Sequence, residues 1–106
     1  PAPRDVLVCI PRSRLKAVEE EEARVAEAVR RGHKPPTYFW TVGRLPATQP
    51  RRVYFCWDGA IRAYHDCVGM IREPDHRLLL DHVIHKIGTP IEQPSFRGWR
   101  YWEPSR

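Results

Sequence analysis

The sequence predicts an α+β fold, mostly β, in which one main helix covers a small pseudobarrel of five to six strands. Three observations support this fold class. Apolar and aromatic runs of strand length recur along the chain, a single segment has helical periodicity, and an Asp-Gly pair joins two of the β-prone runs. In a small domain, such elements pack as a curled sheet with the helix against one side.

The first third of the chain predicts a strand followed by the main helix. Residues 5–10 form an apolar run closed by a proline, which is typical of a buried strand. Ser13 is a candidate N-cap for a helix over about residues 14–31, which Gly32 would end. Glu22 interrupts the apolar stripe of this helix. The stripe itself consists of Leu15, Val18, Val25 and Val29, with Ala26 beside it.

A central hairpin is predicted around Asp58-Gly59. The pair lies between the β-prone runs 51–57 and 60–68, and both positions of a two-residue turn need positive φ. One face of the hairpin would be mostly apolar and would hold Tyr54, Cys56, Ile61 and Ala63. The other would be aromatic and would hold Val53, Phe55, Trp57, Arg62 and Tyr64.

Three further segments complete the predicted sheet. Residues 37–42 form an aromatic strand, and residues 78–88 contain one or two strands. Pro90 and Pro94 would break that segment. Residues 96–102 predict a closing strand.

Length and composition predict one globular domain over residues 1–106. The chain is 42% hydrophobic and 29% charged. No apolar run approaches the ~18 residues of a membrane span, and no signal peptide opens the sequence, so we expect a cytoplasmic protein with no membrane partner. Cys9, Cys56 and Cys67 are odd in number and lack CxxC spacing, which predicts buried thiols in a reducing compartment.

Metal and catalytic patterns are weak. The Cys and His residues form no close pairs of zinc-ligand spacing, so we expect neither a metal nor another cofactor. A small metal-independent ribonuclease is nevertheless an alternative function. Its acid, base and phosphate clamp would come from His65, Tyr64, Arg62 and Lys86. The spacing of these residues does not single them out, so a non-catalytic role is favoured.

Charge and aromatic placement favour nucleic-acid binding. The net charge is +5, and 15 of the 18 basic residues are arginine, which grips phosphate and stacks on bases. Aromatic residues interleave with these arginines along the predicted strands, a composition suited to single-stranded or extruded bases. The candidate binding residues are Trp40, Arg44, Trp57, Arg62, Tyr64, Arg97 and Trp99. About half of the aromatic rings are expected to fill the core instead.

The hairpin also resembles a known family. Its residues Val53-Tyr54-Phe55, Ile61, Tyr64 and Val68 are similar to the central hairpin of PUA-like domains, the superfamily that includes the ASCH and EVE domains. Residues 96–101 resemble a closing strand of the same pseudobarrel. The resemblance implies a cleft that binds RNA or a modified nucleobase. Residues 11–16 do not match the Gly-x-Lys-x-x-Glu-x-Arg motif of ASCH domains, so no catalytic set is carried over.

A third alternative comes from another class of function. Exposed aromatic residues also suit a protein-interaction module or a homodimer, which is common among small domains.

Overall fold

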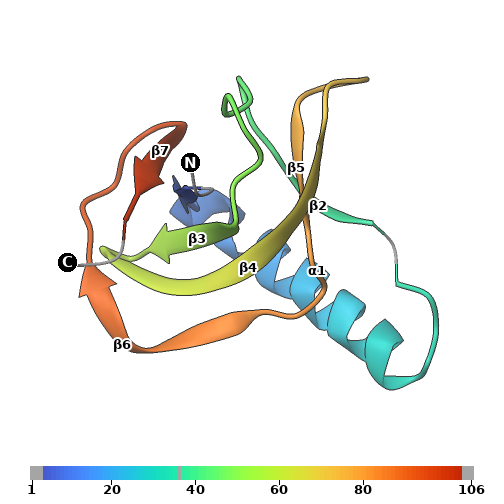
Figure 1. Cartoon of the computed structure of the whole chain (residues 1–106). Coiled ribbons are helices and arrows are strands. Elements are labelled where there is room, and N and C mark those ends of the chain that lie inside the picture. The colour runs from blue at the N-terminus through green and yellow to red at the C-terminus, as the bar shows by residue number, and fades with distance from the viewer. Residues whose placement is uncertain (1–3, 36, 104–106) are drawn as a thin grey trace.

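The computed structural model describes residues 4–35 and 37–103 and shows one helix and seven strands within them (Figure 1). The α+β, mostly β class is confirmed, with seven strands in place of the expected five to six. In chain order the elements are β1 (Asp5–Cys9), α1 (Arg12–Arg30), β2 (Tyr38–Thr41), β3 (Arg52–Trp57), β4 (Ala60–Ile71), β5 (Arg77–Leu80), β6 (His85–Glu92) and β7 (Trp99–Trp102). Along the described residues, no helix is long and apolar enough to cross a bilayer.

One mostly antiparallel sheet joins all seven strands. Its order is β2-β5-β4-β3-β1-β7, and β6 pairs with β4 beside this path. β1 and β3 run parallel, whereas the other pairs are antiparallel. β4 is 12 residues long and curves through the middle of the molecule, where it pairs with β3, β5 and β6 (Figure 1). Its register shifts let one strand serve both halves of the curled sheet.

The Asp58-Gly59 turn is confirmed, but the hairpin beyond it contains a bulge. Asp58 and Gly59 have φ of 50° and 77°, as a two-residue turn requires. Trp57 pairs with Ala60, and Cys56 with Ile61. The register then shifts by one residue and leaves Arg62 without a partner in β3.

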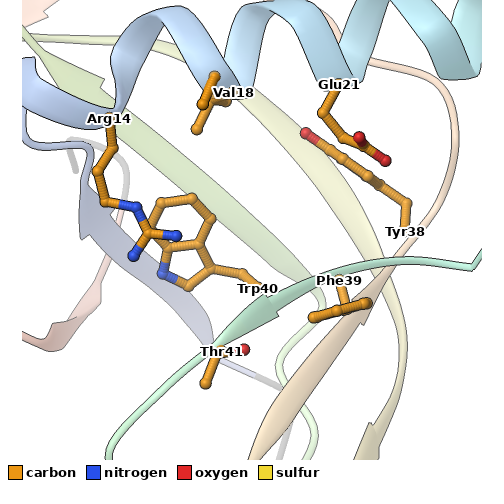
Figure 2. A pocket seen from close by; sticks show the side chains of 8 residues that line it. Arg14, Val18, Glu21, Tyr38, Phe39, Trp40 and Thr41 are labelled. Carbon is orange, nitrogen blue, oxygen red and sulfur yellow. The ribbon is translucent and has the colours of Figure 1, made fainter.

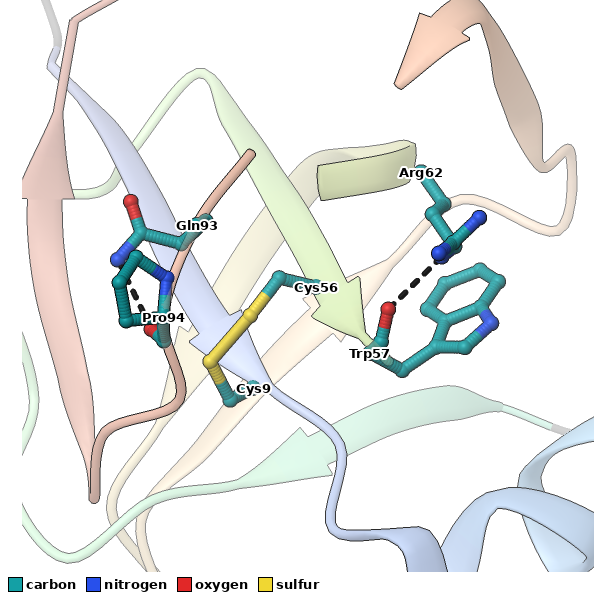
Figure 3. The surroundings of a disulfide bond; sticks show 6 residues. All are labelled: Cys9, Cys56, Trp57, Arg62, Gln93 and Pro94. Carbon is teal, nitrogen blue, oxygen red and sulfur yellow. Dashed lines mark hydrogen bonds between the residues drawn. A yellow bond between two sulfur atoms is a disulfide. The ribbon is translucent and has the colours of Figure 1, made fainter. Parts of the chain in front are cut away.

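This bulge makes the predicted composition of the hairpin faces wrong. Beyond it Phe55 lies opposite Ala63, and Tyr54 lies opposite Tyr64, so Ala63 and Tyr64 exchange faces relative to the prediction. Tyr64 packs against the core cluster around Tyr54. The Arg62 side chain turns back to the hairpin end, where it donates hydrogen bonds to the carbonyl oxygens of Trp57 (2.8 Å; Figure 3) and Asp58 (3.0 Å).

The helix begins two residues earlier than predicted. Pro11 occupies the N-cap position with φ of −61°, and no side chain caps the first turn, so the assignment of Ser13 as N-cap is wrong. The helix ends at Arg30, and Gly32 follows with φ of 74°. Val25 is buried, whereas Val29 is 49% exposed. The predicted apolar stripe therefore docks through Leu15, Val18 and Val25 but not through Val29.

Two hydrophobic clusters cover the two faces of β1 and β3. The first lies under α1 and includes Val6, Val8, Val25, Val53, Phe55 and Leu78. The second lies on the opposite face and includes Leu7, Tyr54, Cys56 and Ile61. Because both faces of β1 are covered, its residues form the near-continuous apolar run seen in the sequence.

Two of the cysteines form a disulfide bond (Figure 3). Cys9 and Cys56 lie opposite each other on the parallel strands β1 and β3, with their Cα atoms 4.6 Å apart. The sequence predicts buried thiols at all three cysteines, and this prediction is wrong for Cys9 and Cys56. Sequence spacing does not reveal that β1 pairs with β3, which brings these two residues together. Cys67 is the free, buried cysteine.

The prediction that Pro90 breaks the strand segment is also wrong. β6 continues through this residue to Glu92. The pairing of β6 with β4 shifts register between Ile61 and Ala63, which leaves Pro90 outside the paired positions. An edge strand tolerates a proline there because no ladder hydrogen bond needs its missing N–H.

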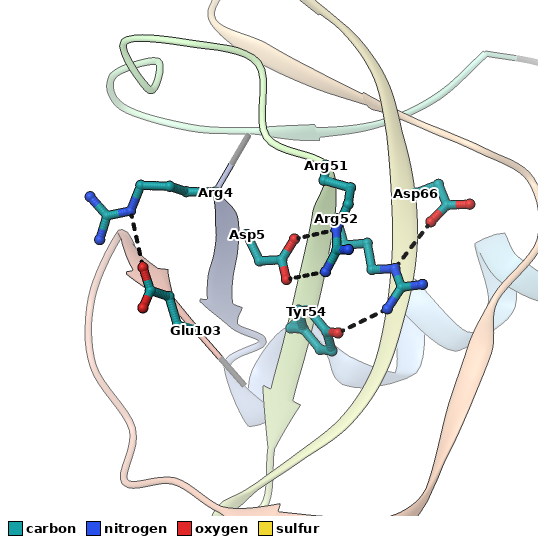
Figure 4. A network of polar contacts seen from close by, with 7 residues as sticks. All are labelled: Arg4, Asp5, Arg51, Arg52, Tyr54, Asp66 and Glu103. Atoms are coloured by element: carbon teal, nitrogen blue, oxygen red, sulfur yellow. Dashed lines mark hydrogen bonds and ion pairs between the residues drawn. The ribbon is translucent and has the colours of Figure 1, made fainter. Parts of the chain in front are cut away.

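Charged contacts tie the end of the sheet where β1, β3 and β4 meet (Figure 4). Asp5 is 4% exposed and accepts two hydrogen bonds from the Arg51 guanidinium, at 3.0 and 3.2 Å. Arg52 donates to the Tyr54 hydroxyl at 3.3 Å and lies 3.6 Å from Asp66. The buried carboxylate is thereby paired, as its burial requires.

Candidate nucleic-acid interface

A pocket of about 190 Å³ opens between α1 and β2 (Figure 2). We call it the α1–β2 pocket. Its helix side includes Arg14, Val18 and Glu21, and its strand side includes Tyr38, Phe39 and Trp40. It is smaller than the ~300–1,000 Å³ typical of sites for drug-sized ligands, so it suits one small planar group.

The spacing of Tyr38 and Trp40 suits a planar ligand. Residues two apart in a strand lie on the same face, ~6.6 Å apart at a rise of ~3.3 Å per residue. A ring inserted between two others needs ~7 Å, twice the optimal carbon–carbon contact of ~3.5 Å. Both side chains extend from β2 toward α1 on either side of the pocket (Figure 2).

Core contacts hold both rings in place. Trp40 is half-buried and packs edge-on against Phe55, with ring centroids 5.4 Å apart. Tyr38 is 8% exposed, and its hydroxyl donates a hydrogen bond to Glu22 Oε1 at 3.2 Å. Burial, together with the neighbouring Glu22 carboxylate, raises the pKa of Tyr38 well above its ordinary value. The phenol therefore stays neutral at physiological pH.

Arg14 brings positive charge to this pocket. Its Cζ lies 5.8 Å from the centroid of the Trp40 ring, within cation–π range (Figure 2). Glu21, on the same helix, is paired with Arg24. The first turn of α1 contains no acidic residue, and Arg14 has no ion pair with any described residue. Its guanidinium is free to contact an anion at the pocket.

Three predicted site residues meet elsewhere, at a hollow of about 340 Å³. We call it the Arg44–Arg97 hollow; its lining consists of Gly43, Arg44, Arg97, Gly98 and Trp99. Trp99 is 6% exposed, and its Nε1 donates a hydrogen bond to the Arg44 carbonyl oxygen at 2.8 Å. The Arg44 guanidinium lies over the Trp99 ring, 4.1 Å from its centroid. That ring face is covered, so Trp99 supports an arginine here.

The other predicted binding residues lie outside both places. Trp57 lies near Lys86, whose Nζ is 5.7 Å from the indole centroid. The Arg62 guanidinium donates hydrogen bonds to carbonyl oxygens at the hairpin turn. Tyr64 stacks on His85 at 4.7 Å and 10°, and Arg52 lies over its ring. Of the seven predicted residues, the structure therefore brings Trp40 to the pocket and Arg44, Arg97 and Trp99 to the hollow.

The four residues named for the ribonuclease alternative do not converge. His65 and Tyr64 are consecutive in β4 and lie on opposite faces of the sheet. His65 is 1% exposed and packs against Tyr38 and Phe55 under α1. Its ring cannot contact a substrate in this conformation. Among the described residues, no group of three or more His, Cys, Asp or Glu side chains is arranged to hold a metal ion.

Sequence reasoning missed three residues of this region. Arg14 was not singled out, although it lies in a helical first turn without acidic residues. Tyr38 was not separated from its aromatic neighbours. Glu22 was seen only as an interruption of the apolar stripe, yet it accepts the Tyr38 hydrogen bond and lies 3.5 Å from His65 Nε2. A carboxylate inside an apolar helix stripe is the sequence signal from which this buried polar contact could be predicted.

Comparison of the chain with protein-family models, with curated proteins and with solved structures gives no match.

Proposed function

We propose that this domain binds single-stranded or extruded-base nucleic acid, with RNA as the preferred ligand, and that one base enters the α1–β2 pocket. The observation that carries the proposal is a pocket lined by two aromatic rings from one face of β2, Tyr38 and Trp40, and bordered by Arg14. A PUA-like fold is part of the same proposal, supported by the single helix packed on a curled, mostly antiparallel sheet.

The chemistry of the pocket matches a nucleobase better than a simple anion or a lipid. Aromatic rings stack on any base and contribute ~1–3 kcal/mol each, and a flanking arginine adds cation–π or phosphate contact. Glu21 and the Tyr38 hydroxyl supply polar atoms to the same region, which a base can use through its exocyclic groups. A membrane ligand would need an apolar surface much larger than this one.

Direct binding measurements test the proposal. Fluorescence anisotropy of a labelled single-stranded RNA would be recorded at several salt concentrations for the wild type, Trp40→Ala and Trp40→Phe. We expect Trp40→Ala to weaken binding about tenfold and Trp40→Phe to retain most of the affinity, because a ring remains for stacking. Circular dichroism of each variant checks that the fold is intact.

Two results would count against the proposal. If the wild type and a folded Trp40→Ala variant bound RNA with equal affinity, the claim that a base enters this pocket would be contradicted. Absence of RNA binding, together with a dimer in light scattering, would instead favour the interaction-module alternative.

A further inference from the structure

The Arg44–Arg97 hollow has the features of an anion site. Arg44 follows β2 and Arg97 precedes β7, so two loops distant in sequence contribute one arginine each to the lining of one hollow. Both residues are exposed, and neither forms an ion pair with any residue that the structure describes. No carboxylate lines the hollow. Positive charge without a counter-charge favours an anionic ligand.

Trp99 pre-organises one of the two arginines. Its indole is buried against β1, and the Nε1 hydrogen bond to the Arg44 carbonyl oxygen ties the loop after β2 to β7. The ring then supports the Arg44 guanidinium at 4.1 Å. A stacked guanidinium keeps its N–H donors at its edge, free for hydrogen bonds, and loses less side-chain entropy on binding.

The backbone around the hollow is open. Gly43 and Gly98 line it, and a Cβ built on either glycine would meet no atom within 4 Å. Gly98 has φ of 75°, a left-handed conformation that glycine adopts readily, in the turn between Arg97 and β7. A ligand can therefore approach the two arginines without displacing a side chain.

Phosphate is the anion that this arrangement fits best. Each guanidinium offers a fork of N–H donors, which matches the oxygens of a phosphate group in a bidentate way. The hollow offers no open aromatic face for a base, because Arg44 covers Trp99. Arg44 also follows Trp40 by four residues, a separation of at most ~14 Å along an extended chain. One strand of nucleic acid can span that distance.

We propose that Arg44 and Arg97 form a phosphate-binding subsite, which holds a phosphodiester group of the strand whose base enters the α1–β2 pocket. This inference depends on the proposed function for the source of the phosphate. The chemistry itself, a phosphate held by two arginines, does not depend on it.

A titration with inorganic phosphate tests the subsite without nucleic acid. Two-dimensional ¹H–¹⁵N NMR spectra would be recorded as phosphate replaces chloride at constant ionic strength. We expect saturable shifts confined to the amides of Gly43 and Gly98 and to the Trp99 indole N–H, absent from Arg44→Gln/Arg97→Gln. Uniform shifts over the whole spectrum, or shifts unchanged in the double variant, would overturn the subsite.

The salt dependence of RNA binding tests the source of the phosphate. For single strands the slope of log K against log salt changes by ~0.7 for each phosphate contact. We expect Arg44→Gln/Arg97→Gln to reduce the slope by about that amount, and the matched control Arg30→Gln/Arg72→Gln, with the same charge change at exposed positions, to reduce it less.

The possible failures are distinguishable. RNA binding with equal slopes in the double variant and its control overturns the subsite and leaves the proposed function standing. Saturable phosphate binding without any RNA binding contradicts the proposed function, and it also overturns the assignment of the phosphate to a strand.

Discussion

His65 Nε2 lies 3.5 Å from Glu22 Oε1 in the interface between β4 and α1. The Nδ1 atom of the same ring lies 2.8 Å from the Asp81 carbonyl oxygen, which can only accept, so Nδ1 carries the hydrogen. In the neutral ring Nε2 is then an acceptor that faces another acceptor, because a carboxylate oxygen such as Glu22 Oε1, which receives the Tyr38 hydroxyl, can only accept. Nε2 has no hydrogen-bond partner in the described structure. The helix that borders the α1–β2 pocket is thus docked through an incompletely satisfied polar cluster.

Glu22→Gln is expected to stabilise the protein. Both contacts of Glu22 use its Oε1, so a glutamine nitrogen at that position can donate one hydrogen to His65 Nε2 and the other to the Tyr38 hydroxyl oxygen. The free energy of unfolding should therefore rise by about 0.5–1.5 kcal/mol. Glu22→Ala should lower it by about 1–3 kcal/mol, since both Tyr38 and His65 lose their neighbour. Chemical denaturation would give these values, with the exposed Glu20→Gln as the matched control. A loss of stability in Glu22→Gln would instead indicate a charged His65–Glu22 pair.

Stability should fall at alkaline pH because of Tyr38. Its pKa is raised in the folded state by burial and by Glu22, whereas the unfolded chain has the ordinary value of ~10. The unfolded state therefore releases the Tyr38 proton at lower pH than the folded state does. The stability that protonated Tyr38 contributes to the folded state is fully present below about pH 10 and is lost as the pH rises further. Denaturation curves across this range should show a shallower decline for Tyr38→Phe. Equal declines would contradict the role given to Tyr38.

Cysteine chemistry gives a prediction about the disulfide. Denatured, unreduced protein should contain one reactive thiol per chain, Cys67, and reduction should reveal two more. In the folded protein Cys67 should react slowly with iodoacetamide, because burial raises the pKa of its thiol. Mass spectrometry of alkylated protein would count the thiols. Three reactive thiols in unreduced protein would show that Cys9 and Cys56 are not bonded.

Removal of the same disulfide should reduce stability. We expect Cys9→Ala/Cys56→Ala to lose about 2–4 kcal/mol of unfolding free energy relative to the oxidised wild type. The two chains should show similar stability once the wild type is reduced, apart from small packing effects. An unchanged denaturation midpoint in the double variant would mean that the pairing of β1 with β3 alone holds these strands together.

Arg14 should contribute to RNA binding beyond its charge. Arg14→Gln removes the guanidinium beside Trp40, whereas Arg31→Gln removes the same charge at the far end of the helix, where the residue pairs with Glu27. We expect about a fivefold or greater loss of affinity for Arg14→Gln, in line with a desolvated cation–π or phosphate contact. Equal losses of RNA affinity for the two variants, measured by anisotropy, would show that Arg14 contributes through net charge alone.

The order of elements could be predicted from sequence because its signals are local. Alternating apolar residues, the Asp58-Gly59 turn and the glycine after the helix each act over a few residues. The bulge at Arg62 and the Cys9–Cys56 bond depend on how strands meet in space. One extra residue on β4 was enough to exchange the hairpin faces after the turn.

The candidate site was predictable in residue type and less so in placement. Trp40, Arg44 and Arg97 were named because aromatic rings and arginines suit nucleic acid. Sequence could not show that Trp99 is covered by Arg44, or that Trp40 lies between the helix and Phe55 of the hairpin. Those facts depend on which strand lies next to which element.

A double-mutant cycle between Trp40 and the base tests the central claim most directly. A short single-stranded RNA and a series of versions with one abasic position each would be bound to the wild type and to Trp40→Ala. If a base occupies the α1–β2 pocket, one abasic position should weaken binding to the wild type about tenfold and leave the affinity of Trp40→Ala nearly unchanged. Independent, additive losses at every position would contradict the claim that the pocket between α1 and β2 receives a base.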